Sequence, residues 1–64
     1  MWESELWRRL EDVLGAGYVR AWAGQQAIPG LDSRTVLEAL DDGVDARTVW
    51  RACWAFLELP ESAR

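Results

Sequence analysis

Histidine and lysine are both missing from this 64-residue sequence, and Cys53 is its only cysteine. One cysteine cannot form an internal disulfide. Without histidine there is no His/Cys pattern for a structural metal. Cys53 also lacks a neighbouring base that would make it a nucleophile. We therefore expect no metal site, no cofactor, no small-molecule ligand and no enzymatic activity.

Long hydrophobic runs are missing too. No apolar stretch approaches the roughly 18 residues that a membrane span requires. The first five residues, Met1–Glu5, are acidic and lack the basic start and apolar run of a signal peptide. These absences predict a cytoplasmic protein without a membrane partner.

Large aromatic residues are plentiful for so short a chain, with five Trp, one Tyr and one Phe. A chain of this size buries only about 60% of its unfolded surface, so large side chains must fill the core. We expect one domain over residues 1–64, with Trp7, Trp22 and Trp50 in its core. Trp2 precedes the first helix and Trp54 lies at the edge of an apolar stripe, so both are predicted to be partly exposed.

Apolar residues recur at helical spacing in four segments, which predicts an all-α fold, a compact bundle of about four short helices. The expected helices cover residues 5–14, 18–26, 35–41 and 46–57. Ser4 is the expected N-cap of the first helix, and Ile28-Pro29-Gly30 is expected to form a turn. The residues predicted to face the core are Leu6, Trp7, Leu10, Val13, Leu14, Tyr18, Val19, Trp22, Ala23, Val36, Leu37, Ala39, Leu40, Ala46, Val49, Trp50, Cys53, Phe56 and Leu57.

The last two predicted helices have the features of a helix-turn-helix-like pair. Thr35 and Glu38 have the spacing of a capping box. Gly43 can adopt the left-handed backbone of a tight turn, and Asp45 is placed to cap the following helix. A short turn containing Gly between two helices is typical of the helix-turn-helix.

Charge limits what such a pair would bind. Seven Arg against 11 Asp and Glu give a net charge of −4. Residues 32–43 contain four acids and one Arg, whereas nucleic-acid binders carry a basic face. Arg47, Thr48 and Arg51 nevertheless suit base edges and phosphates. Together with the two Trp residues expected to be exposed, they form the candidate interaction surface: Arg47, Thr48, Arg51, Trp54 and Trp2.

Several segments resemble a family of short actinobacterial proteins known as domain of unknown function 3046. They are Leu6-Trp7-Arg8-Arg9-Leu10-Glu11-Asp12-Val13-Leu14-Gly15, the Tyr18, Trp22 and Ala23 pattern, Arg34 to Asp45, Val49-Trp50-Arg51-Ala52, and Leu59-Pro60. The resemblance implies a cytoplasmic actinobacterial protein, often encoded near recombinase A and RecX-type regulatory genes. It implies no activity and no catalytic residues.

Two hypotheses follow. The first is an unidentified protein partner, for which the chain would serve as an interaction or accessory module linked to recombination or DNA repair. The alternative is a nucleic-acid-binding helix-turn-helix that reads its site with the last helix.

Overall fold

Helices account for all the regular elements along residues 2–63, the part of the chain that the computed structural model describes. They are α1 (Glu3–Leu14), α2 (Val19–Gln25), α3 (Val36–Asp41) and α4 (Ala46–Phe56), with short 3₁₀ helices η1 (Pro29–Leu31) and η2 (Glu61–Ala63). The prediction of a small all-α bundle is confirmed. The expected domain range of 1–64 includes Met1 and Arg64, which lie outside the described residues.

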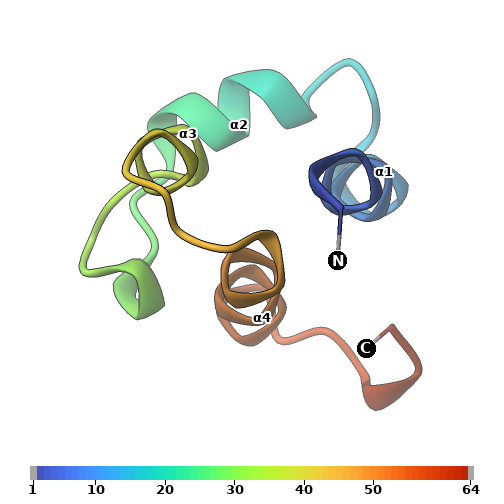
Figure 1. The fold of residues 1–64 in the computed structure, drawn as a ribbon. Coiled ribbons are helices and arrows are strands. Elements are labelled where there is room, and N and C mark those ends of the chain that lie inside the picture. Colours follow the sequence, from blue (N-terminus) through green and yellow to red (C-terminus); the bar gives the residue numbers. More distant parts are fainter. Residues whose placement is uncertain (1, 64) are drawn as a thin grey trace.

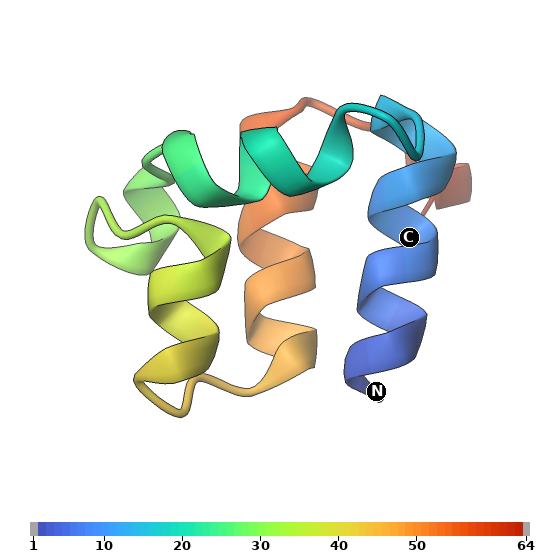
Figure 2. The same cartoon turned by 90° about the horizontal axis from the view of Figure 1, so that it is seen from above.

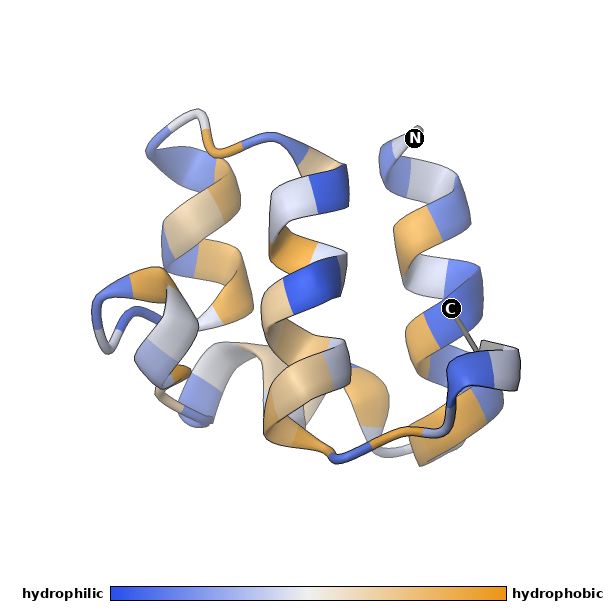
Figure 3. Ribbon diagram, turned by 90° about the horizontal axis from the view of Figure 1, so that it is seen from below, coloured by the Kyte–Doolittle hydropathy of each residue, from blue (hydrophilic) through white to orange (hydrophobic). Residues whose placement is uncertain are grey.

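The axes of three helices are roughly aligned. Figure 1 shows α1, α3 and α4 along their axes, with α2 lying across them. In Figure 2, α4 lies between α1 and α3; it runs parallel to α1 and antiparallel to α3. The view from the opposite side, in Figure 3, shows α4 in front, so one of its sides is left uncovered by the other helices.

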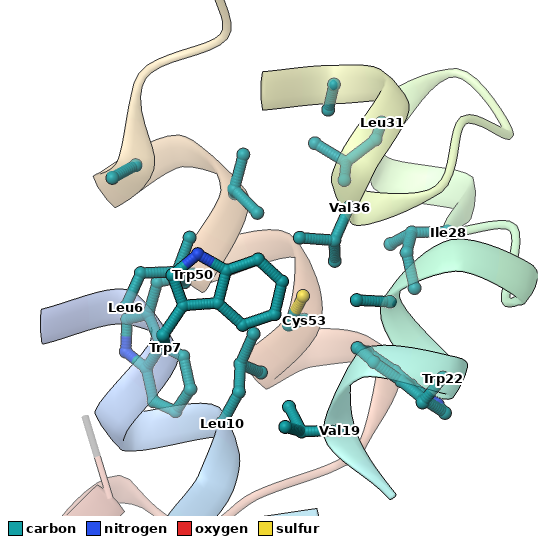
Figure 4. Close-up of a cluster of buried hydrophobic side chains, with 14 residues drawn as sticks. Leu6, Trp7, Leu10, Val19, Trp22, Ile28, Leu31, Val36, Trp50 and Cys53 are labelled. Atoms are coloured by element: carbon teal, nitrogen blue, oxygen red, sulfur yellow. The ribbon is translucent and has the colours of Figure 1, made fainter. Parts of the chain in front are cut away.

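The core gathers around α4 and is built largely from the predicted residues. Trp7, Trp22 and Trp50 are all buried, which confirms the prediction for these three aromatics. Figure 4 shows the Trp50 ring beside Leu6 and Trp7, with Cys53 close to it. The buried residues are Leu6, Trp7, Leu10, Val19, Trp22, Ala23, Ile28, Leu31, Val36, Ala39, Ala46, Val49, Trp50 and Cys53.

Four residues predicted to face the core are instead exposed. The exposed fractions are 40% for Val13, 55% for Tyr18, 43% for Leu37 and 38% for Phe56. Each lies at the margin of its apolar stripe, and the stripes are wider than the short neighbours that cover them. Two buried residues were not predicted to face the core. Ile28, in the expected turn, and Leu31, directly after it, both lie in the core, because η1 packs directly on α4.

The helix starts follow local hydrogen-bonding chemistry, with one correction. The Thr35–Glu38 capping box is present, with Glu38 N–H donating to Thr35 Oγ1 at 3.1 Å and Thr35 N–H to Glu38 Oε1 at 2.8 Å. The prediction of Ser4 as the first N-cap is wrong. Helix α1 already begins at Glu3, after Trp2, so Ser4 lies inside its first turn. The carboxylates of Glu3 and Glu5 in that turn interact favourably with the positive end of the helix dipole.

The ends of α3 and α4 have the same backbone pattern but different residues. After α3, Val44 N–H donates to the Ala39 carbonyl at 2.9 Å, around Gly43 at φ +86°. After α4, Leu59 N–H donates to the Trp54 carbonyl at 3.1 Å, around Glu58 at φ +53°. Both are Schellman motifs, which favour glycine at the left-handed position. The motif after α3 has glycine there, whereas the motif after α4 has Glu58.

The predicted pair of helices and its glycine turn are present as a helical hairpin. Residues 42–45 connect α3 to α4, and the two helices lie side by side in opposite directions in Figures 1 and 2. Antiparallel helices joined by a loop of this length form an αα-hairpin. The helices of a DNA-binding helix-turn-helix cross at roughly 90–120° instead.

Candidate interaction surface

The uncovered side of α4 carries three of the predicted site residues. Arg47, Thr48 and Arg51 are exposed, as is Ala55 one turn further along. Their spacing of three and four residues places them on one side of the helix. We refer to Arg47, Thr48, Arg51 and Ala55 as the outer side of α4.

The two arginines on this outer side are not paired with a carboxylate. Within residues 2–63, neither Arg47 nor Arg51 forms an ion pair with a carboxylate. Arg8 on α1 is likewise exposed without an ion pair among the described residues, whereas Arg9 pairs with Glu5 at 3.0 Å and Arg34 pairs with Asp42 at 3.1 Å. The guanidinium of Arg20 lies 4.1 Å from the centre of the Trp7 ring, in a cation–π contact. The outer side of α4 therefore presents two guanidinium groups that form no ion pair within the described chain.

Thr48 serves the helix start. Its backbone N–H and its hydroxyl both donate to Asp45 Oδ2, at 3.1 and 3.2 Å. These bonds confirm Asp45 as the N-cap of α4. The backbone hydrogen bond from Thr48 is the main reason that the pKa of Asp45 is lowered. The proton of the Thr48 hydroxyl is thus used in the cap, and this hydroxyl can only accept a hydrogen bond from a partner.

The two remaining predicted residues differ strongly in exposure. Trp2, the N-cap residue of α1, is 79% exposed. Trp54 is only partly exposed, packs against the core, and donates its indole N–H to the Pro60 carbonyl at 3.1 Å. The starts of α1 and α4 lie at the same end of the molecule in Figures 2 and 3. Trp2 and Arg47 therefore share that end, whereas Trp54 holds the segment after α4 in place.

A shallow apolar groove beside the outer side of α4 was not predicted. It has a volume of about 290 Å³ and lies between η1 and α4, lined by Pro29, Gly30, Ala52, Ala55 and Phe56. We call it the η1–α4 groove. Small residues allow the two segments to approach closely, since a Cβ built on Gly30 would lie 3.2 Å from that of Ala52. The only sequence signal was the presence of small residues in both segments, and it did not indicate that they meet.

The interior offers little reactive chemistry. Cys53 is fully buried, and desolvation raises the pKa of its thiol to about 12. A thiol that stays protonated is a poor nucleophile. Among the described residues, no group of three or more His, Cys, Asp and Glu could hold a metal ion.

A family model matches the chain, and its description names no activity. The model of the family described as "Protein of unknown function (DUF3046)" matches residues 1–62. The chain belongs to this family. The comparisons with curated proteins and with solved structures found no match. No helix in residues 2–63 of this DUF3046 member is long and apolar enough to cross a membrane.

Proposed function

We propose that this DUF3046 protein is a protein-interaction module that binds its partner through the outer side of α4. The observation that supports this proposal is that Arg47 and Arg51 are exposed and form no ion pair within the described residues, although the chain has a net charge of −4. In the free protein, neither guanidinium group forms an ion pair with a carboxylate of the described chain. Complementary charges across an interface steer association and set specificity. A partner that presents carboxylates would match this side.

We also propose that the protein is not an enzyme. Support comes from a sequence without histidine and from a buried thiol whose pKa is about 12. Nucleophilic catalysis needs an activated nucleophile and a base within hydrogen-bond reach. Cys53 has neither the exposure nor the partner for that role.

In cellular terms, we propose an accessory role in recombination or DNA repair, with a protein of that machinery as the partner. The support is the gene neighbourhood that the family resemblance implies. An accessory protein of this kind would act by occupying a surface of another protein, which agrees with the absence of an activated nucleophile.

Nucleic-acid binding is the second candidate function, and the exposure of Arg47 and Arg51 favours it. Three features weigh against it. The Thr48 hydroxyl is bonded to Asp45. Asp41 and Asp42, at the end of the antiparallel α3, are exposed. Non-specific affinity for DNA depends on many cations neutralising phosphates, and the outer side of α4 has two.

The test is site-specific photo-crosslinking in the cells that encode the protein. A photoreactive amino acid at Ala55 is expected to capture one protein, and the same group at Ala21, exposed on α2, is expected not to capture it. The captured protein, purified, should then bind the wild-type chain and lose about tenfold or more affinity for the Arg47→Glu/Arg51→Glu variant.

Two results would contradict the proposal. One is identical crosslinking from both positions. The other is duplex DNA binding at low salt that disappears when Arg47 and Arg51 become Ala, which would favour the nucleic-acid function instead.

A further inference from the structure

The two unpaired arginines and the η1–α4 groove share one helix. Ala55 is exposed and also lines the groove. It follows Arg51 by four residues and Arg47 by eight, so the arginines lie roughly 6 and 12 Å from it along the helix axis. In Figure 3, strongly hydrophilic positions occur in the first half of α4, and its second half has apolar colours. Charge and apolar surface are thus adjacent and ordered along α4.

The groove is shaped for one side chain. Its volume of about 290 Å³ is open to solvent, and its lining combines the Pro29 ring, the Phe56 ring and small residues. Phe56 remains 38% exposed although its ring lies 6.5 Å from that of Trp22, centre to centre. A groove of this kind suits the aromatic or branched aliphatic anchor of a peptide, the usual centre of binding energy in an interface.

The charges around the groove determine the orientation of an acidic segment bound in it. At the far end of α4, the exposed carboxylate of Glu58 follows Ala55 by three residues. On the η1 side, the exposed Asp32 lies 3.9 Å from Arg34, which also pairs with Asp42 at 3.1 Å. A bound carboxylate is therefore attracted toward Arg51 and Arg47 and repelled from the Glu58 end.

We propose that the η1–α4 groove binds a short acidic and apolar segment of a partner protein. One aromatic or branched aliphatic side chain of the segment occupies the groove, and carboxylates on one side of it contact Arg51 and Arg47. This inference rests on the proposed function and specifies the chemistry of the partner. The charges set which way the bound segment lies, and the groove holds its apolar side chain. Both are therefore required for tight binding.

The probe is a displayed library of random dodecapeptides, selected against the intact chain. Peptides with Asp or Glu on one side of an aromatic or aliphatic residue are expected to be enriched. Their affinities are then measured by fluorescence anisotropy against two pairs of matched variants. Arg47→Glu/Arg51→Glu and Ala55→Gln should each weaken binding by about tenfold or more. Arg8→Glu on α1 and Ala21→Gln on α2, both at exposed positions, should leave it within about twofold.

A charge swap separates recognition from damage to the fold. Peptides with Lys in place of their acidic residues should bind the Arg47→Glu/Arg51→Glu variant better than they bind the wild type. Circular dichroism checks that each variant is folded, and Arg47→Gln/Arg51→Gln replaces the charge reversal if that variant does not fold.

The possible failures are distinct. Enriched peptides that lack acids, or that keep their affinity for the Ala55→Gln variant, overturn the groove inference but leave an interaction role elsewhere on the surface. Enrichment of no peptide overturns the inference, and the crosslinking experiment then decides the proposed function on its own. Duplex DNA that competes with the peptides at low salt and depends on Arg47 and Arg51 overturns both.

Discussion

Helix α4 has an inner side and an outer side that serve different purposes. On the inner side, Val49, Trp50 and Cys53 are between 0% and 3% exposed, and the helix packs on α1, α3 and η1. On the outer side, Arg47 and Arg51 are exposed and have no carboxylate partner within the described residues. One amphipathic helix therefore lies at the centre of the small core and still leaves one complete side exposed. Changes on the inner side should therefore affect stability, and changes on the outer side should affect binding.

The largest expected effect is at Trp50. Replacing it with Ala should lower the free energy of unfolding by about 3–5 kcal/mol, because a large buried ring leaves a cavity. Trp50→Phe should cost far less, since the buried indole N–H has no hydrogen-bond partner in the described structure and its removal ends an uncompensated desolvation. Urea titration followed by circular dichroism measures both. Equal losses for Phe and Ala would contradict this account of the inner side.

Gly30 tests the flank of α4 where the groove lies. A Cβ there would meet the Ala52 Cβ at 3.2 Å, so Gly30→Ala should cost about 1–3 kcal/mol of unfolding free energy through overpacking. Gly24→Ala is the matched control. Its Cβ meets only the flexible end of Leu37, at 3.3 Å, and the better helix former should add up to about 1 kcal/mol. Thermal unfolding of both variants should therefore show shifts of opposite sign.

Cys53 makes the inner side sensitive to alkaline pH. Burial raises its pKa from 9.0 to about 12, so the unfolded chain releases this proton at lower pH than the folded chain. The stabilisation is complete below pH 9 and is lost progressively as the pH rises toward 12. The loss is about 1.4 kcal/mol per pH unit within that window. Urea unfolding at pH 8.5 and 10.5 measures it. The slope should be smaller in Cys53→Ala, and an unchanged slope would exclude the thiol as its source.

The two Schellman motifs predict a smaller pair of changes. Glu58→Gly should raise the free energy of unfolding by about 1 kcal/mol, because φ +53° strains a residue with a Cβ. Gly43→Ala should lower it by about the same amount, for the same reason, at φ +86°. Both are measured by urea titration. A loss of stability in Glu58→Gly would show that the Glu58 side chain contributes more than its backbone strain costs.

The smallest expected effect on stability is on the outer side. Arg47→Gln and Arg51→Gln should each change the free energy of unfolding by less than about 0.5 kcal/mol, as exposed residues without partners do. The same variants should weaken binding of the peptides selected above. A large loss of stability would contradict the assignment of this side to a partner.

Local chemistry explains what could be predicted from the sequence. The Thr35–Glu38 box and the Asp45 cap join residues three positions apart, so they form wherever those residues stand at a helix start. The positions of Trp7 and Trp50 followed from helical spacing, because large apolar rings on such a stripe are buried first. For the candidate site, only the exposure of single residues could be predicted. Arg47 and Arg51 are exposed as expected, whereas Thr48 and Trp54 are occupied by contacts with nearby residues.

The four helices, most of their ends and the greater part of the core follow from local sequence, since these depend on hydrogen bonds and periodicity within a few residues. Tertiary packing set which apolar stripes are covered, and it left Phe56 partly exposed. It also decided that Gly30 would lie against Ala52 and open a groove beside Arg51. Such a surface depends on how two distant segments approach each other, and that approach is set by packing of the whole core rather than by any local pattern.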